Sequence, residues 1–298
     1  MKDFRRIICT NKDGYSIAFG EKSFSPFLLV DADGCYEASN SVTVSENTMI
    51  DGGSYQGSVA SVRNIVLTVA DVSNYVENRN LLYRLFKAGE AGRLVFHELC
   101  DGEETKRYTD YYVEKIEGTG KNGCRQYQMS LICPDPFFYD MEDVRVSMAA
   151  WISDFTFPHA FRKWEELGHR SDVRLQDIRN DTATDRIGIS VSVYANGAVR
   201  NPAIVHVEKN QRLQIGSKNN PFTMSSGDRL QITTGTGNKH LYYTDVATGT
   251  ERDISQYLTE DSEFVQLGRG DNTIGYDAES GAGNMTITIT YRLRYAGA

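Results

Sequence analysis

The fold class follows from a stretch near the end of the chain, Met285-Thr286-Ile287-Thr288-Ile289-Thr290-Tyr291-Arg292-Leu293-Arg294-Tyr295. Apolar and polar side chains alternate along it, and a period of two places them on opposite faces of a strand. We therefore expect a half-buried strand of about ten residues here. The same alternation recurs at 187–193, 126–133 and 65–69, so the chain is predicted to be mainly β.

One helix interrupts this pattern in the first half of the chain. Asn74 and Glu77 have the spacing of a capping box, and Gly89 supplies a C-terminal break. The apolar positions share one helix face: Leu81, Leu82, Leu85 and Phe86. A helix of about 14 residues is unstable alone in water, so it must pack against a sheet. The first half is thus predicted to be an α+β unit.

The character of the sequence changes between the two strand-rich halves. Residues 146–184 carry paired aromatic side chains and then a charged run, so we assign 1–145 to an N-terminal domain and 146–184 to a connecting segment. Residues 185–298 contain short strand patterns separated by turn signals, which is typical of a β-sandwich. The aromatic residues of the connecting segment are Trp151, Phe155, Phe157, Phe161 and Trp164.

Composition and charge exclude several classes of protein. The net charge of −8 disfavours nucleic-acid phosphates and anionic membrane surfaces as partners. No apolar run approaches the roughly 18 residues of a spanning helix, and the first residues lack the apolar core of a signal peptide. We expect no membrane insertion, no sequence-specific nucleic-acid binding and synthesis in a cytosol-like compartment.

The residues that could support chemistry form no recognisable site. The five cysteines contain no C-x-x-C pair, and we interpret them as reduced, mostly buried small hydrophobic residues. The five histidines show no H-x-x-x-H or H-E-x-x-H spacing, and no G-x-S-x-G elbow is present. The sequence therefore predicts no enzyme, no cofactor, and no catalytic, cofactor-binding or metal-binding residue.

Three short motifs are better explained as turns than as binding sites. The segment Gly118–Gly123 has the letters of a dinucleotide fingerprint, but a strand and not a helix follows it. The Asp31–Gly34 segment lacks the remaining ligands of a calcium loop. Arg269-Gly270-Asp271 is an adhesion tripeptide set among turn-forming residues, and we interpret it as a structural loop.

Taken in order, these segments and several others resemble the distal tail proteins of long-tailed bacteriophages, also called siphovirus tail components. The N-terminal landmarks are Asp51–Tyr55, the strand 62–69, Arg79–Gly89, Gly92–Phe96 and, most distinctive, Cys133-Pro134-Asp135-Pro136-Phe137-Phe138-Tyr139. The C-terminal landmarks are Phe155–Pro158, Asn180-Asp181, Gly197–Pro202, Gly227–Ile232, Leu267–Tyr276 and Tyr291–Gly297. The resemblance covers nearly the whole chain, although Gly297-Ala298 replaces an expected Gly-Ile.

The resemblance implies a fold and a structural role. It implies an N-terminal split-barrel-like domain with one packed helix, followed by a galectin-like or carbohydrate-module-like β-sandwich. It also implies a six-fold ring at the tail tip of the virion, assembled in the cytoplasm of the bacterial host. That ring would join the tail tube protein to the tail-associated hub or spike protein around a DNA channel. Receptor-binding or side-fibre proteins would attach at its rim.

Two features leave alternatives open. Tyrosines such as Tyr108, Tyr111, Tyr112 and Tyr127 suit partly wet subunit contacts, but they are equally ordinary strand residues. The sandwich could instead bind a host-surface saccharide, and the sequence does not identify its saccharide-binding residues. The candidate stacking residues are Trp151, Trp164, Tyr242, Tyr243 and Tyr257. A wall-degrading enzyme is a third class, for which the residues give no support.

Overall fold

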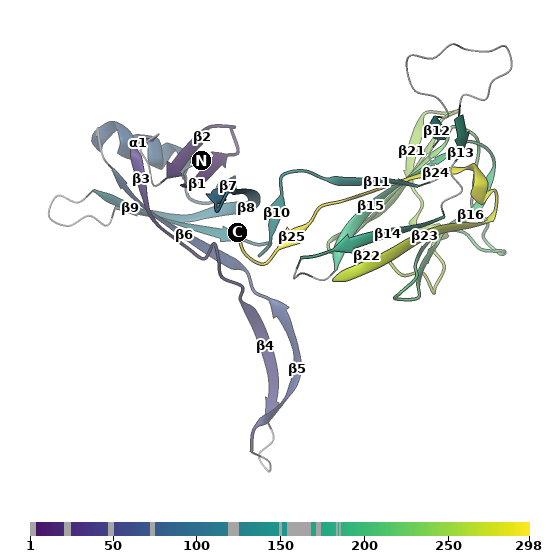
Figure 1. Ribbon diagram of the computed structural model, residues 1–298, viewed down its shortest axis with the longest axis horizontal. Helices are drawn as coiled ribbons and strands as arrows, with labels where there is room; N and C mark the ends of the chain where they lie inside the picture. The colour runs from purple at the N-terminus through teal and green to yellow at the C-terminus, as the bar shows by residue number, and fades with distance from the viewer. Residues whose placement is uncertain are drawn as a thin grey trace. The chain divides into compact units, whose positions relative to one another are not determined.

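The computed structural model describes residues 4–20, 25–46, 51–71, 75–118, 125–148, 151–153, 168–170, 174–182, 184 and 186–298. The chain forms two compact units. The first comprises Met1–Met141 and Arg294–Ala298, and the second comprises Glu142–Leu293. Both units are built almost entirely from strands, which confirms the mainly β prediction (Figure 1). Among the described residues, no helix is long and apolar enough to cross a bilayer.

The first unit is a barrel-like sheet in which β9 pairs with both β6 and β8. Its strand order is β25-β10-β8-β7-β1-β2-β3-β6-β9, and β2 and β3 meet in a single parallel pair, Gly20↔Leu28. The bounds are β1 Phe4–Asn11, β2 Ser16–Gly20, β3 Phe27–Asp33, β6 Arg63–Asp71, β7 Ala91–Cys100, β8 Glu103–Gly118, β9 Gln126–Cys133, β10 Phe138–Asp140 and β25 Arg294–Tyr295.

The helix α1 spans Tyr75–Leu85 and packs on the core of this unit. Leu82, Leu85 and Phe86 are buried, and the Phe86 ring lies 6.1 Å from that of Phe19 and 6.4 Å from that of Tyr111. The helix is therefore held by the apolar face that the sequence predicts. Gly89, with φ of 80°, lies in the turn that follows the helix, four residues after Leu85. The proposed cap, Asn74, lies outside the described residues.

The second unit is a sandwich of two antiparallel sheets. One sheet has the order β11-β24-β15-β19-β20-β21, with β22 beside β15, and the other has the order β14-β23-β16-β17, with β18 beside β16. The bounds are β11 Val144–Met148, β14 Leu175–Asn180, β15 Ile187–Ala195, β16 Val199–His206, β17 Gln211–Gln214, β18 Thr223–Met224, β19 Arg229–Gly235, β20 Asn238–Asp245, β21 Thr250–Asp253, β22 Gln266–Leu267, β23 Gly270–Ser280 and β24 Met285–Tyr291. Two 3₁₀ turns occupy Ser255–Tyr257 and Ala282–Asn284.

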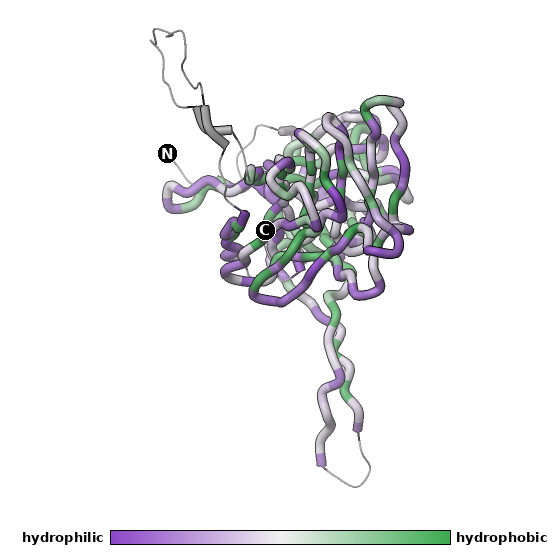
Figure 2. Tube along the Cα trace, turned by 90° about the vertical axis from the view of Figure 1, so that its right-hand side faces the viewer, coloured by the Kyte–Doolittle hydropathy of each residue, from purple (hydrophilic) through white to green (hydrophobic). Residues whose placement is uncertain are grey.

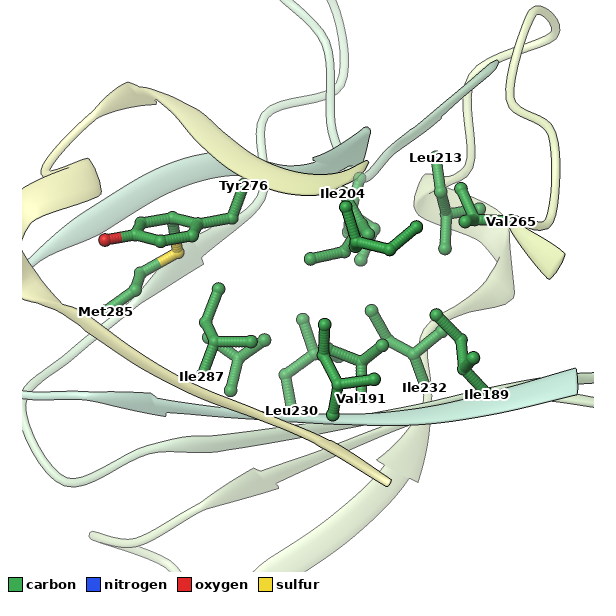
Figure 3. Packing of buried hydrophobic residues seen from close by; sticks show 14 of the residues in the cluster. Ile189, Val191, Ile204, Leu213, Leu230, Ile232, Val265, Tyr276, Met285 and Ile287 are labelled. Carbon is green, nitrogen blue, oxygen red and sulfur yellow. The ribbon is translucent and has the colours of Figure 1, made fainter. Parts of the chain in front are cut away.

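Apolar side chains from the two sheets meet in one core (Figure 3). Val191, Ile232 and Ile287 come from one sheet, and Ile204 and Leu213 come from the other. All of them are at least 96 % buried, since their exposed fractions are 4 % or less. Burial of a side chain of this size contributes on the order of 1.5–3 kcal/mol, so the core dominates the stability of the sandwich.

The segment used to predict the fold does not form one strand. Its first part, Met285–Tyr291, is β24 in the sandwich, whereas Arg294–Tyr295 pairs with β10 in the first unit. The alternation of side chains continues through both parts, but the chain changes sheet after Tyr291. Period-two patterning reports which faces are buried and not which strand lies alongside, so the break is invisible in the sequence.

The last residues of the assigned N-terminal domain, 142–145, and the assigned connecting segment both belong to the second unit. Val144–Met148 pairs with β24, and Leu175–Asn180 pairs with β23. Two short strands, β12 Trp151–Ser153 and β13 Gly168–Arg170, pair with each other. Most of the aromatic cluster assigned to this segment, Phe155 to Trp164, lies outside the described residues, as does the Trp151 side chain. The structural division thus falls at 141–142 and 293–294.

Candidate assembly surfaces

The described residues contain no constellation of catalytic type. No group of three or more His, Cys, Asp and Glu side chains in this part of the chain could hold a metal ion. His97 pairs with Glu104 at 2.7 Å, and His206 is buried against the Asn272 amide at 3.0 Å. These histidines are held by structural partners.

The cysteines behave mainly as core residues. Cys9, Cys35 and Cys133 are free and buried, whereas Cys100 is exposed and Cys124 lies outside the described residues. Burial raises the pKa of Cys35 to about 12 and that of Cys133 to about 11. Burial also raises the pKa of Cys9 well above its ordinary value. These three thiols stay protonated near neutral pH and are poor nucleophiles.

The three sequence motifs lie in turns or strands. Gly118 ends β8, and the rest of its glycine-rich motif is outside the described residues. Asp31–Asp33 end β3, and the turn begins at Gly34, which has φ of 80° and donates its amide to Asp33 at 3.0 Å. Arg269 lies in a bend and Gly270 begins β23 with φ of 84°. None of the three brings ligand-binding groups together in the described residues.

The most exposed element of the first unit is a two-stranded ribbon. It consists of β4, Asn40–Glu46, paired antiparallel with β5, Gly53–Ala60, and it pairs with no other described strand. Figures 1 and 2 show it running away from the sheet to which it is attached, with apolar and polar residues interspersed along both strands. All of β4 and nearly all of β5 are solvent-exposed.

The pairing register separates the ribbon into two unlike faces. Val44 lies opposite Tyr55 and Val42 lies opposite Ser58, and residues directly opposite share a face. This apolar face exposes 52 % of Val44, 56 % of Val42 and 66 % of Tyr55. The reverse face carries small side chains: Ser41, Thr43, Ser45, Ser54 and Gly57, together with Val59. The ribbon is therefore amphipathic, with its apolar face uncovered in the single chain.

A second feature of the first unit is a clasp around Arg63, whose exposed fraction is only 7 %. Its guanidinium donates to the carbonyls of Pro136 at 2.7 Å and Gly34 at 2.6 Å, and also to the carbonyl of Ala296. The cation lies 5.1 Å from the Phe138 ring centroid. Arg63 thus joins segments that are far apart in the chain.

The segment 294–298 completes this clasp. Tyr295 pairs with Phe138, and the Arg107 guanidinium lies 3.6 Å from the Tyr295 ring centroid. Arg107 also donates to the Gly297 carbonyl at 3.1 Å, and the Ala298 amide donates to the Cys35 carbonyl at 2.9 Å. Figure 1 shows β25 alongside β10. The first unit is therefore closed by residues that follow the whole second unit in sequence.

The four tyrosines considered either as interface residues or as ordinary strand residues are not equivalent. Tyr108, Tyr111 and Tyr127 are buried in the first unit with exposed fractions of 8 %, 1 % and 2 %, so they are strand residues of the core. Tyr112 is 51 % exposed and is available for an interface. Burial raises the pKa of Tyr111 far above its ordinary value, which keeps its hydroxyl protonated.

The candidate saccharide-stacking residues are not equivalent. Tyr243 is buried and donates to Asp228 at 2.6 Å, and Tyr257 packs on Phe222 with ring centroids 5.2 Å apart. Tyr242 is the exposed one of the three, at 37 %. The Trp151 side chain and Trp164 lie outside the described residues. Of the described candidates, Tyr242 is the most exposed, Tyr257 is partly buried and Tyr243 is buried.

Neither the ribbon nor the clasp is among the features predicted from the sequence. The signal for a strand here is Ser41–Ser45, in which valine alternates with serine and threonine. Arg63 carries no local signal, because its acceptors come from residues 29, 73 and 233 positions away.

Solved structures of phage proteins share this architecture. The Dit protein of phage SPP1 superposes with a TM-score of 0.68 at 12 % identity, and the match covers 97 % of this chain and 99 % of that one. This chain has the fold of a phage tail hub protein. The phage P2 baseplate in its activated conformation with calcium matches with a TM-score of 0.50 at 10 % identity over the full length of both chains.

These matches confirm the expected resemblance to distal tail proteins at the level of fold. The SPP1 protein is described as a paradigm of the hub of the adsorption apparatus in phages that infect Gram-positive bacteria. No family model matches the chain, and no curated protein sequence matches it. The similarity is therefore one of fold, because sequence identity is low.

Proposed function

We propose that this chain is a structural component of a bacteriophage tail tip, and that copies of it assemble into a ring through the β4–β5 ribbon. The observation that carries the proposal is the exposed apolar face of the ribbon, formed by Val42, Val44 and Tyr55. The shared fold with the SPP1 hub protein supports the tail-tip role.

An isolated two-stranded hairpin is at best marginally stable in water. The ribbon leaves its apolar face in solvent, where each half-exposed valine forgoes roughly 1 kcal/mol of burial free energy. Docking this face on a neighbouring subunit would recover that free energy and fix the ribbon in one conformation. A second copy of the chain is the occupant we propose, because the ribbon and the barrel surface of the next copy form a head-to-tail contact that can close into a ring.

The proposed ring defines where DNA and the partner proteins would lie. Six copies would surround a channel for DNA, with the tail tube protein on one side and the tail-associated hub or spike protein on the other. Receptor-binding or side-fibre proteins would attach to the rim. The proposed place of the protein is the virion, after assembly in the bacterial cytoplasm. The proposed role is mechanical and involves no chemical step.

Light scattering coupled to size-exclusion chromatography tests the ring on the full chain. We expect a discrete species near 200 kDa for six copies of the 33.4 kDa chain. Val44→Asp would place a charge on the apolar face and should shift the population to single subunits. Thr43→Asp is the matched control, because Thr43 is the neighbouring residue on the reverse face of the same ribbon.

These measurements test the ring and the ribbon interface separately. Loss of assembly in Val44→Asp with assembly retained in Thr43→Asp supports the ribbon as the interface. A wild-type chain that stays at the mass of one subunit at every concentration contradicts the ring. Equal assembly of wild-type and Val44→Asp contradicts the ribbon as its basis. Negative-stain images of the large species should show annular particles.

A further inference from the structure

The outer face of the larger sandwich sheet has an unusual composition. Apolar side chains from β11, β24, β15, β19 and β20 point into the core, as Figure 3 shows for β24, β15 and β19, so the residues between them point outward. The edge strand β21 has no apolar side chain and pairs with β20. Along these six strands, which the structure describes in full, no aliphatic side chain lies on the outer face. The face instead presents hydroxyl, amide, charged and aromatic groups.

This composition favours a polyhydroxylated ligand over a protein. Protein–protein interfaces have an apolar centre and a polar rim, and this face lacks the aliphatic groups to form such a centre. Saccharides, by contrast, offer hydroxyl groups to planar polar side chains and an apolar C–H face to an aromatic ring. The outer face contains both kinds of group in one row.

The row crosses three neighbouring strands. Gln231 on β19 lies directly opposite Tyr242 on β20, and Tyr242 lies directly opposite Asp253 on β21. Adjacent strands are about 4.8 Å apart, so the three side chains span roughly the width of one or two pyranose rings. The His240 ring stacks against the Tyr242 ring, with centroids 5.6 Å apart and planes 22° from parallel.

The polar members of the row are held in place by other residues. The Gln231 oxygen accepts from Ser192 at 3.0 Å, and its amide nitrogen donates to Ser190 at 2.9 Å. The Asp253 carboxylate accepts from the Ser255 amide at 2.7 Å. Hydrogen bonds from Ser255 also hold the pKa of Asp253 below its ordinary value, so this carboxylate is ionised near neutral pH. Preorganised polar groups lose less entropy when a ligand binds.

We propose that Gln231, Tyr242 and Asp253 form a binding site for a neutral pyranose saccharide on the outer face of the sandwich. The apolar face of the sugar packs on the Tyr242 ring, the Gln231 amide donates to one ring hydroxyl, and Asp253 accepts from another. The negative charge of Asp253 disfavours an acidic sugar. This site goes beyond the proposed ring and does not depend on it.

Saturation-transfer NMR on the full chain tests the site with four soluble probes. The probes are methyl α-D-glucopyranoside, methyl β-D-galactopyranoside, N-acetylglucosamine and L-rhamnose. We expect transfer to at least one of them, with the dissociation constant then measured by calorimetry. Tyr242→Ala should weaken that binding about tenfold, because it removes the stacking ring. Tyr15→Ala is the matched control, since Tyr15 is a 62 % exposed tyrosine of the other unit.

A second variant covers the case in which Tyr242→Ala does not fold. Gln231→Leu keeps the volume of the side chain and removes its hydrogen-bonding groups, and we expect a several-fold loss of affinity with an unchanged thermal midpoint. Absence of transfer to all four probes overturns the site. Equal affinity in wild-type and the folded row variants overturns it as well. The subunit mass of these variants is measured in parallel, so a failure of this site is distinct from a failure of the ring.

Discussion

The two units of this chain reach a closed fold by different means. The sandwich is one continuous segment, Glu142–Leu293, whose two sheets bury a common apolar core. The barrel is interrupted by the whole of that segment and is completed by Arg294–Ala298. The barrel has an apolar core of its own, and its last segment is held in addition by the buried Arg63 cation and by backbone carbonyls. A polar contact that joins distant segments should therefore make the barrel more sensitive than the sandwich to the change of a single arginine.

The largest effect is expected at the clasp. Arg63→Met keeps much of the apolar volume but leaves the buried Gly34 carbonyl and the part-buried carbonyls of Pro136 and Ala296 without this donor. Each unsatisfied buried group costs about 1–3 kcal/mol, so we expect a loss of roughly 4 kcal/mol in the free energy of unfolding of the first unit. Hydrogen exchange should accelerate throughout β6, β9 and β10 and stay unchanged in β15 and β19.

The control for this variant is Arg212→Met in the sandwich. Arg212 is 45 % exposed in its side chain and pairs with Asp277 at 3.2 Å, so its loss should cost less than about 1 kcal/mol. If Arg63→Met and Arg212→Met destabilise the protein equally, the clasp does not close the first unit.

A smaller effect is expected at Asp228, a buried carboxylate of the sandwich. Burial by itself would raise its pKa, but hydrogen bonds from Tyr243, Ser225 and Val246 outweigh burial and hold the pKa below its ordinary value. Asp228→Asn removes one acceptor oxygen, and we expect a loss of about 2 kcal/mol because the hydrogen bonds involve a charged group.

The pH dependence of Asp228 has a definite sign. Because the folded pKa is lowered, its stabilisation is fully present above about pH 5 and is lost as the pH falls below about 4 through the folded pKa. Thermal unfolding at a series of pH values should show the wild-type and Asp228→Asn midpoints converging in acid. A constant difference between them down to pH 2 would contradict the assignment.

The smallest effect is expected on the barrel surface. Arg93 pairs with Asp110 at 2.7 Å and lies 4.2 Å from the Tyr108 ring centroid, but its side chain is 49 % exposed. Exposed ion pairs contribute about 0.2–1 kcal/mol, so Arg93→Ala should lower the stability of the first unit by less than about 1 kcal/mol. Denaturant unfolding measures this, and a loss as large as that of Arg63→Met would remove the distinction between surface and clasp.

The sequence was sufficient for features that depend on neighbouring residues. The alternation of Tyr127, Met129, Leu131 and Cys133 predicts the buried face of β9, and the spacing of Leu82, Leu85 and Phe86 predicts how α1 packs. Features that depend on distant partners were not predictable. Arg63 meets Ala296 across 233 positions, and the stretch from Met285 to Tyr295 divides between two sheets without any change in pattern.

The exposure of the ribbon is a surface feature that was likewise not predictable from the sequence. Its alternating valines and serines are those of any half-buried strand, and the sequence does not reveal that its apolar face is left in solvent. Tyr242 and Tyr243 are a different case, because adjacent residues of a strand point to opposite faces and Tyr243 shares the core face with Leu241.

The most direct test of the ring is hydrogen exchange of the ribbon before and after assembly. An isolated ribbon is marginally stable, so amides of 40–46 and 53–60 should exchange rapidly in single subunits. In the large species these amides should be strongly protected, while β15 and β19 of the sandwich core should exchange equally slowly in both. Equal exchange of the ribbon in single subunits and in the large species would contradict the account.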